Sequence, residues 1–190
     1  MTQPCLIVLT GAPGTGKTAI LRSLALAHVP EPAREVLAEQ RAMGGTGTAQ
    51  SDPARFVELL LERSIEKHRA ALERGQSVLF DRGIPDCVAY ARHLGGDPEP
   101  CRKAAAIHRY HATVLVTRPW AEIYSTDDER TMSFEATLPF QRLLEDAYEE
   151  AGYELIEVPR GSIAERGAFV RRFVGTEAEG GRGGIGQKTP

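Results

Sequence analysis

A glycine-rich run, GAPGTGKT at residues 11–18, follows directly on the apolar run LIVLT. It fits the pattern G-x-x-x-x-G-K-[ST], in which backbone N–H groups surround the phosphates of a nucleoside triphosphate. We therefore expect Lys17 to neutralise the β- and γ-phosphates and the Thr18 hydroxyl to reach Mg²⁺, with ATP and Mg²⁺ as cofactors. The loop residues expected to bind the nucleotide are Gly11, Ala12, Pro13, Gly14, Thr15, Gly16, Lys17 and Thr18.

The loop does not identify the molecule that receives the terminal phosphate, but other residues narrow the choice. The sequence contains no asparagine, so it lacks the N-K-x-D motif that reads guanine in switch GTPases. The run VLFDRG places Asp81 before Arg82, where a motor or remodelling ATPase would carry a second acid to polarise water. Because arginine holds an anion or a polar acceptor better than it activates water, the pair favours a kinase.

Apolar runs and helical patterns alternate along the chain, which predicts an α/β fold with a parallel sheet. We expect strands over 5–11, 76–81, 112–119 and 153–159, a short strand near 27–30, and helices over 17–26, 31–42, 53–75, 87–96, 99–111, 138–152 and 162–174. Ligands of such sheets bind beyond the carboxyl ends of the strands. The glycine-rich loop, Asp81, Arg118 and Pro159 are all predicted at that edge.

The runs LTGAPGTGKT, PEPAREVLAEQ, LFDRGIPDCVAYAR, DDERTMSFE and GYELIEVP follow one another along the chain. In this order they resemble a family of small bacterial P-loop proteins described as AAA-domain or ATP-binding proteins. That family is similar to the ribosylnicotinamide kinase domain and, more distantly, to deoxynucleoside and thymidylate kinases. The resemblance implies a three-layer P-loop NTPase fold of the nucleotide-kinase type with a lid, over residues 1–174. The Gly-rich residues 175–190 are expected to form a disordered tail.

The resemblance also implies roles for residues at matching positions. Asp81 is expected near Mg²⁺ or its waters, and Arg82 on the acceptor or the transferred phosphoryl group. Alternatively, Asp81 only caps the helix that follows it. A carboxylate of the run EPARE would accept the proton of an acceptor hydroxyl. Glu31 and Glu35 both remain candidates; Glu35 is preferred because it matches the Arg-Glu pair of the ribosylnicotinamide kinase domain, and a salt-bridged helix surface is the alternative.

Three further arginines are predicted at the site. Arg130 lies in the charged run STDDERTMSF, where related kinases carry a lid, and would close over the phosphates. The alternative for this run is a solvated stretch of charges. Arg118, and Arg160 in the run PRGS, occupy positions at which similar folds hold adenine.

The composition of the chain limits its partners. A net charge of -3 over 190 residues argues against nonspecific binding to nucleic acid, which depends on Lys and Arg. No apolar run is long enough to span a bilayer, and the N-terminus lacks the pattern of a secretory signal. Three widely spaced cysteines fit a reducing cytosol, so a cytoplasmic location is expected.

Together these features predict a phosphotransferase that uses ATP and Mg²⁺ and acts on a hydroxyl of a small molecule, for which a nucleoside-like compound is one candidate. Two other functions stay open from the sequence. One is a nucleotide-binding regulator or slow ATPase that signals to a protein partner. The other is a kinase acting on nucleic-acid 5′ ends.

Overall fold

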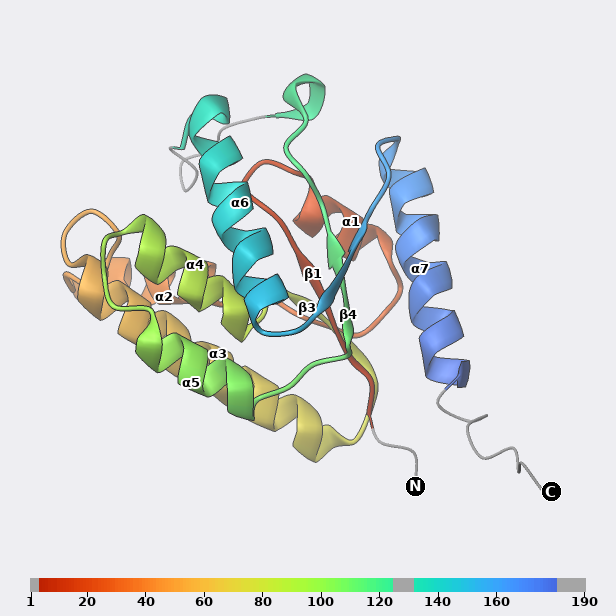
Figure 1. The fold of residues 1–190 in the computed structure, drawn as a ribbon, viewed down its shortest axis with the longest axis horizontal. Coiled ribbons are helices and arrows are strands. Elements are labelled where there is room, and N and C mark those ends of the chain that lie inside the picture. The colour runs from red at the N-terminus through yellow and green to blue at the C-terminus, as the bar shows by residue number, and fades with distance from the viewer. Residues whose placement is uncertain (1–3, 125–131, 181–190) are drawn as a thin grey trace.

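A parallel β-sheet forms the centre of the computed structural model, which describes residues 4–124 and 132–180 (Figure 1). Within these residues the sheet has five strands in the order β2-β3-β1-β4-β5. The strands are β1 (Leu6–Thr10), β2 (His28–Val29), β3 (Val78–Asp81), β4 (Thr113–Val116) and β5 (Glu154–Glu157). The short strand expected near 27–30 is therefore present as β2, at one edge of the sheet.

Helices cover both faces of the sheet. They are α1 (Lys17–Ser23), α2 (Pro32–Met43), α3 (Pro53–Arg74), α4 (Ile84–His93), α5 (Glu99–Ile107), the 3-10 helix η1 (Ala121–Ile123), α6 (Phe134–Glu150) and α7 (Ile163–Gly180). Helices α1 and α7 lie together on one face, and α2 to α6 lie on the other (Figure 1). This arrangement confirms the predicted three-layer P-loop fold.

The central strand β1 explains why the two faces have separate cores. All of its residues are buried, and neighbouring side chains along a strand point to opposite faces. Ile7 and Leu9 pack with α1 and α7, whereas Leu6 and Val8 pack with residues from α4, α5 and α6. A strand covered on both sides must be apolar throughout, as this one is.

Several helix boundaries differ from those predicted. Helices α1, α4 and α5 end at Ser23, His93 and Ile107, three or four residues before the predicted ends, and α4 begins at Ile84, three residues earlier than predicted. Helix α6 begins at Phe134 rather than at Leu138, because the side chain of Ser133 caps it by accepting a hydrogen bond from the backbone N–H of Ala136 at 3.3 Å. Helix α7 continues to Gly180, beyond the predicted domain boundary at 174, so the first residues assigned to a tail are helical. None of the helices in the described ranges has the combination of length and apolar character that crossing a membrane requires.

Candidate active site

The glycine-rich loop connects β1 to α1 at the carboxyl edge of the sheet. Its glycines are needed for two different reasons. Gly14 and Gly16 have φ angles of 77° and 83°, a left-handed conformation that favours glycine. At Gly11, a Cβ atom would lie 2.1 Å from the carbonyl oxygen of Thr117. The loop thus combines a special backbone shape with close packing against the end of β4.

Side chains from distant segments hold the loop in this shape. The Oε1 atom of Gln141, on α6, accepts a hydrogen bond from the backbone N–H of Ala12 at 2.8 Å. The Thr15 and Thr117 hydroxyls are hydrogen-bonded at 2.7 Å, and Nη2 of Arg166, on α7, donates to the Thr15 carbonyl at 2.8 Å. Gln141, Thr117 and Arg166 were not predicted at the site, because no local pattern links them to a loop more than a hundred positions away.

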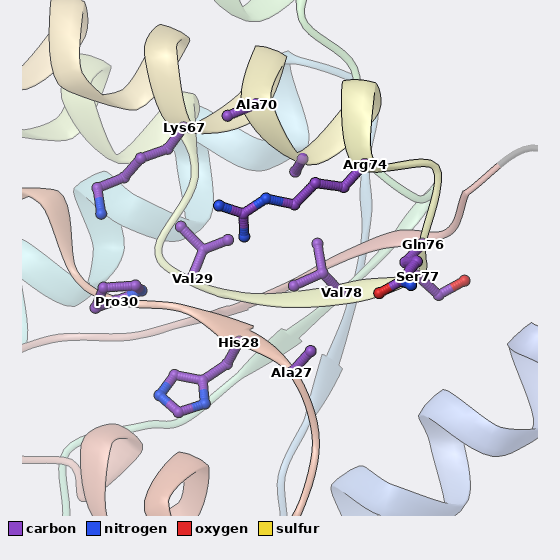
Figure 2. Close-up of a pocket in the computed structure, with 11 residues that line it drawn as sticks. Ala27, His28, Val29, Pro30, Lys67, Ala70, Arg74, Gln76, Ser77 and Val78 are labelled. Atoms are coloured by element: carbon purple, nitrogen blue, oxygen red, sulfur yellow. The ribbon is translucent and has the colours of Figure 1, made fainter.

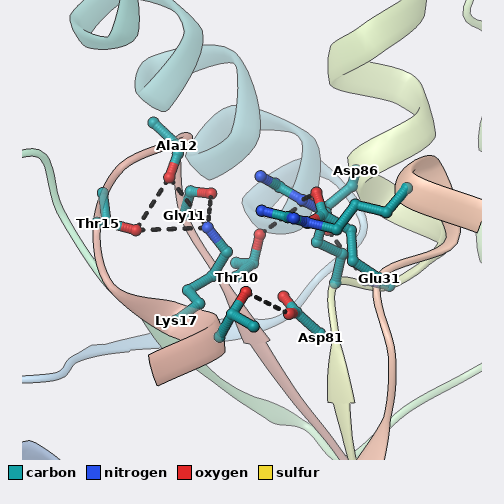
Figure 3. A network of polar contacts seen from close by, with 12 residues as sticks. Thr10, Gly11, Ala12, Thr15, Lys17, Glu31, Asp81 and Asp86 are labelled. Atoms are coloured by element: carbon teal, nitrogen blue, oxygen red, sulfur yellow. Dashed lines mark hydrogen bonds and ion pairs between the residues drawn. The ribbon is translucent and has the colours of Figure 1, made fainter. Parts of the chain in front are cut away.

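The side chain of Lys17 points back into the loop (Figure 3). Its Nζ atom donates to the carbonyl oxygens of Gly11 at 2.7 Å and Ala12 at 3.0 Å, and the residue is 5% exposed. Burial and the nearby guanidinium of Arg82 lower the pKa of Lys17 to about 7, against the opposing effect of Asp81. Phosphate groups placed here would restore its full charge, since an anion favours the protonated amine.

Asp81 and Thr18, the two residues predicted to serve the metal, lie side by side. The Thr18 hydroxyl donates to Oδ2 of Asp81 at 3.3 Å. The other carboxylate oxygen, Oδ1, is buried and has no hydrogen-bond partner among the described residues. Burial, together with the charge of Glu31, raises the pKa of Asp81. A free carboxylate oxygen beside a hydroxyl provides the oxygen ligands that Mg²⁺ prefers, so these residues fit the metal.

Arg82 has an unusual backbone conformation. Its φ angle is 73°, which costs about 1–3 kcal/mol for a residue with a side chain and persists only where the surroundings fix it. The side chain is 3% exposed. Its Nε atom lies 2.6 Å from Oε1 of Glu31, and Nη1 lies 2.8 Å from Oδ1 of Asp86. Two carboxylates therefore hold the guanidinium in one position.

Asp86 is a further residue of the site that was not predicted from the sequence. Besides Arg82, its carboxylate accepts hydrogen bonds from the Thr10 hydroxyl at 2.8 Å, the Gly83 backbone N–H at 3.0 Å and the Tyr148 hydroxyl. It thus caps the start of α4 and connects β1, α6 and the arginine. An acid three residues after a helix cap is a recognisable capping signal, so the run GIPD could have identified it.

Glu31, directly before α2, lies at the site. Besides its bond to Arg82, it accepts a hydrogen bond from Nε of Arg34 at 3.1 Å, and its side chain is 11% exposed. Burial alone would raise its pKa, but Arg82, Lys17 and Arg34 together lower the pKa of Glu31 to about 2. Glu31 is therefore a carboxylate anion near neutral pH, available to accept a hydrogen bond.

Glu35, the glutamate that the resemblance favoured, faces α3 instead. Its carboxylate oxygens lie 2.7 Å from Nζ of Lys67 and 3.2 Å from Nη1 of Arg63. Lys67 in turn lines a separate cavity of about 170 Å³ between β2 and α3, together with His28 and Arg74 (Figure 2). Neither the glycine-rich loop nor the carboxyl end of β3, where Asp81 lies, borders that cavity. The structure thus brings Glu31 to the loop, while Glu35 forms the salt-bridged helix surface that was its alternative.

The two arginines expected near adenine are exposed and have other partners. Arg118 bonds to the carboxylates of Glu145 and Glu157, each at 2.9 Å. The guanidinium of Arg160 lies 5.8 Å from the ring centroid of Trp120. Their role in binding adenine stays a prediction. Arg130 lies within residues 125–131, outside the described residues, so the expected lid stays a prediction as well.

Two cavities border the loop. The α2-side cavity, of about 150 Å³, is lined by residues that include Lys17, Glu31, Arg34, Phe56, Arg82 and Tyr90. The α7-side cavity, of about 500 Å³, is lined by residues that include Gly14, Gly16, Thr18, Arg34, Ser162 and Arg166. Different residues of the loop therefore line the two cavities. Arg34, which the sequence analysis did not select, borders both.

Comparison with known sequences places the chain in a family. Residues 6–166 match the sequence family described as an AAA domain. The chain belongs to this AAA-domain family. The AAA-domain chain is also 37% identical, over 102 residues, to a thymidylate kinase of Xanthomonas campestris pv. campestris. That match covers 47% of this chain and 45% of the relative, so the chain spans less than half the length of the curated relatives it matches.

Several solved structures share the fold of this AAA-domain chain. The deoxyadenosine kinase of M. mycoides superposes with a TM-score of 0.64 at 13% identity, covering 90% of this chain and 99% of the other. For the thymidylate kinase of Ehrlichia chaffeensis the TM-score is 0.60 at 15% identity, with coverages of 90% and 99%. For the shikimate kinase of Acinetobacter baumannii it is 0.56 at 16% identity, with coverages of 93% and 95%. The fold is therefore that of the nucleotide-kinase P-loop proteins.

Proposed function

We propose that this protein is a kinase that uses ATP and Mg²⁺ to phosphorylate a hydroxyl of a small molecule. The observation that carries the proposal is the position of the Glu31–Arg82 pair, which borders the same cavity as Lys17. An ATPase needs a group that polarises water, whereas a kinase needs a group that orients a second molecule. A fixed carboxylate–guanidinium pair beside the loop lysine meets the second requirement.

The two cavities suggest how donor and acceptor are separated. The α7-side cavity, at about 500 Å³, has the volume of an ordinary small-molecule site, for which about 300–1,000 Å³ is typical. We assign it to the nucleotide, and the α2-side cavity to the acceptor. Arg34 borders both, so it is placed to contact the phosphoryl group during transfer.

Each residue contributes to positioning or to charge neutralisation. Lys17 binds the phosphates, and bound Mg²⁺, held by Thr18 and Asp81, would neutralise charge on their oxygens. With a pKa of about 2, Glu31 is a weak base, so it serves mainly to accept a hydrogen bond from the acceptor hydroxyl. That is sufficient for a loose transition state, in which little negative charge has to build on the attacking oxygen.

The pairing of Arg82 with carboxylates favours a hydroxyl over a phosphate monoester as the acceptor group beside Glu31. A phosphate monoester carries about −1.5 to −2 charges near pH 7 and needs cations that are free to pair with it. Here the guanidinium of Arg82 is already bonded to Glu31 and Asp86. The anionic Glu31 would also repel a phosphate, but it attracts the proton of a neutral hydroxyl.

The cavity walls support a nucleoside-like acceptor as one candidate. Phe56 and Tyr90, which pack edge to face with their centroids 5.8 Å apart, both border the α2-side cavity. Aromatic rings beside a polar pair suit a ligand that has a flat ring and a hydroxyl. Of the structural neighbours, the deoxyadenosine kinase and the shikimate kinase are named for acceptors that have a ring and a hydroxyl, whereas the thymidylate kinase is named for a nucleoside monophosphate.

The decisive test is transfer of label from γ-labelled ATP to a panel of nucleosides, sugars, aminoglycosides, nucleoside monophosphates and 5′-hydroxyl oligonucleotides. We expect label on a hydroxyl compound, and its loss in Lys17→Ala and Asp81→Asn. Release of free phosphate alone, whatever compound is added, would favour the regulatory ATPase. Label on a monophosphate would refute the charge argument, and label on an oligonucleotide would make the protein a nucleic-acid 5′-end kinase.

A further inference from the structure

Arg166 is a buried cation on the other side of the loop. It lies on α7, is 3% exposed, and donates from Nη2 to the Thr15 carbonyl at 2.8 Å. Its Nε and Nη1 atoms are buried and have no hydrogen-bond partner among the described residues. The residue also lines the α7-side cavity. Two donors of a charged group are therefore available beside an open space.

This arrangement is energetically unfavourable in the free protein. Arginine stays protonated even when it is buried, and burial lowers the pKa of Arg166 with no carboxylate among the described residues to oppose that effect. An uncompensated buried charge normally destabilises a fold. A single carbonyl at Thr15 satisfies one donor and supplies no negative charge. An anionic ligand would supply what is missing.

The position of the free Nε and Nη1 donors of Arg166 indicates which kind of anion would bind there. A Cβ atom at Gly16 would lie 2.8 Å from Nη1 of Arg166, so the guanidinium lies directly against the last glycine of the loop. Gly16 belongs to the loop whose backbone N–H groups are expected to surround phosphates. Lys17 faces the α2-side cavity, whereas Arg166 faces the α7-side cavity. The two cations thus border different cavities beside the loop.

We propose that Arg166 binds a phosphate oxygen of the donor nucleotide from the α7 side of the loop, through its Nε and Nη1 atoms. The inference rests on the proposed nucleotide-dependent function and adds a phosphate-binding residue that lies outside the loop motif. It gives α7 a part in nucleotide binding. Because the same side chain bonds to Thr15, nucleotide binding also fixes the loop against α7.

The test compares Arg166→Met with Arg171→Gln, a matched control that removes an exposed charge from the same helix. Titration calorimetry with MgADP measures binding, and thermal unfolding measures the stability of the nucleotide-free proteins. We expect Arg166→Met to bind MgADP at least about tenfold more weakly, since charge-assisted hydrogen bonds are lost. Its nucleotide-free form should melt no lower than the wild type, because an unpaired buried charge is removed. Arg171→Gln should bind like the wild type.

A second variant separates the effect of the positive charge from that of the hydrogen-bond donors. Arg166→Lys keeps the charge but not the fork of donors, and should bind MgADP with intermediate affinity. Unchanged MgADP binding by Arg166→Met would overturn the inference and leave the proposed function intact. Weaker binding accompanied by a lower melting temperature of the free protein would identify Arg166 as a structural brace, which also overturns it. If the wild type bound no MgADP, both proposals would fail.

Discussion

The Nε atom of Arg82 lies 2.6 Å from Oε1 of Glu31, although 51 positions separate the two residues in the sequence. The register of the sheet explains this contact. Strands β2 and β3 are parallel, with Val29 opposite Phe80. Two residues beyond each of these, at the carboxyl edge, the chain places Glu31 opposite Arg82. The ion pair is thus a direct product of strand pairing.

This pairing predicts different consequences for the two glutamates. Glu31→Gln should lower the rate of phosphotransfer by about 10- to 100-fold, because the neutral amide lacks the negative charge that orients the acceptor hydroxyl and holds the guanidinium of Arg82. Glu35→Gln should leave the rate within about twofold, because its partly exposed ion pairs with Lys67 and Arg63 lie away from the loop. The measurement is kcat/KM with the acceptor found by label transfer. Equal losses in the two variants would contradict the assignment.

Nucleotide binding should be coupled to a proton. The pKa of Lys17 is about 7 in the free protein, so at about pH 8.5 the amine is mostly neutral, and bound phosphates will raise its pKa again. We expect uptake of close to one proton per bound nucleotide at about pH 8.5 and much less at about pH 6. Calorimetry in buffers of different ionisation enthalpy measures this uptake. Lys17→Met, which cannot titrate, isolates the contribution of the lysine from that of the nucleotide.

Loss of Asp86 should destabilise the whole domain. Asp86→Ala removes the partner of a buried guanidinium and leaves the hydroxyls of Thr10 and Tyr148 without their acceptor. We expect the free energy of unfolding to fall by about 3–5 kcal/mol, the usual cost of breaking a buried ion pair. Asp146→Ala, at an exposed position of α6, should change it by less than about 0.5 kcal/mol. Urea unfolding of both variants measures these changes in the free energy of unfolding.

A buried histidine makes stability depend on pH. His68, on α3, is 2% exposed; its Nε2 atom lies 2.9 Å from the Arg109 carbonyl, and its Nδ1 atom is buried without a partner among the described residues. Burial, and to a lesser degree Arg69, lowers the pKa of His68. Just below about pH 6.5 the unfolded chain therefore binds more protons than the folded one, so the free energy of unfolding falls as the pH falls.

The contribution of His68 to the pH dependence of stability can be measured directly. Urea unfolding at about pH 7.5 and about pH 5.5 should show a loss of stability in the wild type, and the loss should be smaller in His68→Gln. His28→Gln, at an exposed position of β2, serves as the control and should keep the wild-type dependence on pH. An identical dependence in His68→Gln would show that other groups cause it.

Local patterns were sufficient to predict the fold and part of the site. Lys17 and Thr18 belong to a contiguous motif, and Asp81 ends an apolar strand, so short-range signals located all three. The choice between Glu31 and Glu35 needed the register of β2, a strand of two residues with no periodicity to read. Spacing on a helix could not show which glutamate faces the loop.

The residues that support the loop could not be predicted from local sequence patterns. Gln141 and Arg166 come from α6 and α7 and contact Ala12 and Thr15 only through the tertiary fold. A glutamine or an arginine on an amphipathic helix usually lies in solvent, so nothing in the sequence marks these two as buried. Only the packing of α6 and α7 beside the loop gives them their partners.

In the proposed kinase, the presence of two cavities beside one loop lets the acceptor change independently of the nucleotide. Ala33, Leu37 and Phe56 border the α2-side cavity and not the α7-side cavity. Substitutions at these positions would then change which compounds are accepted and leave the nucleotide site unaltered.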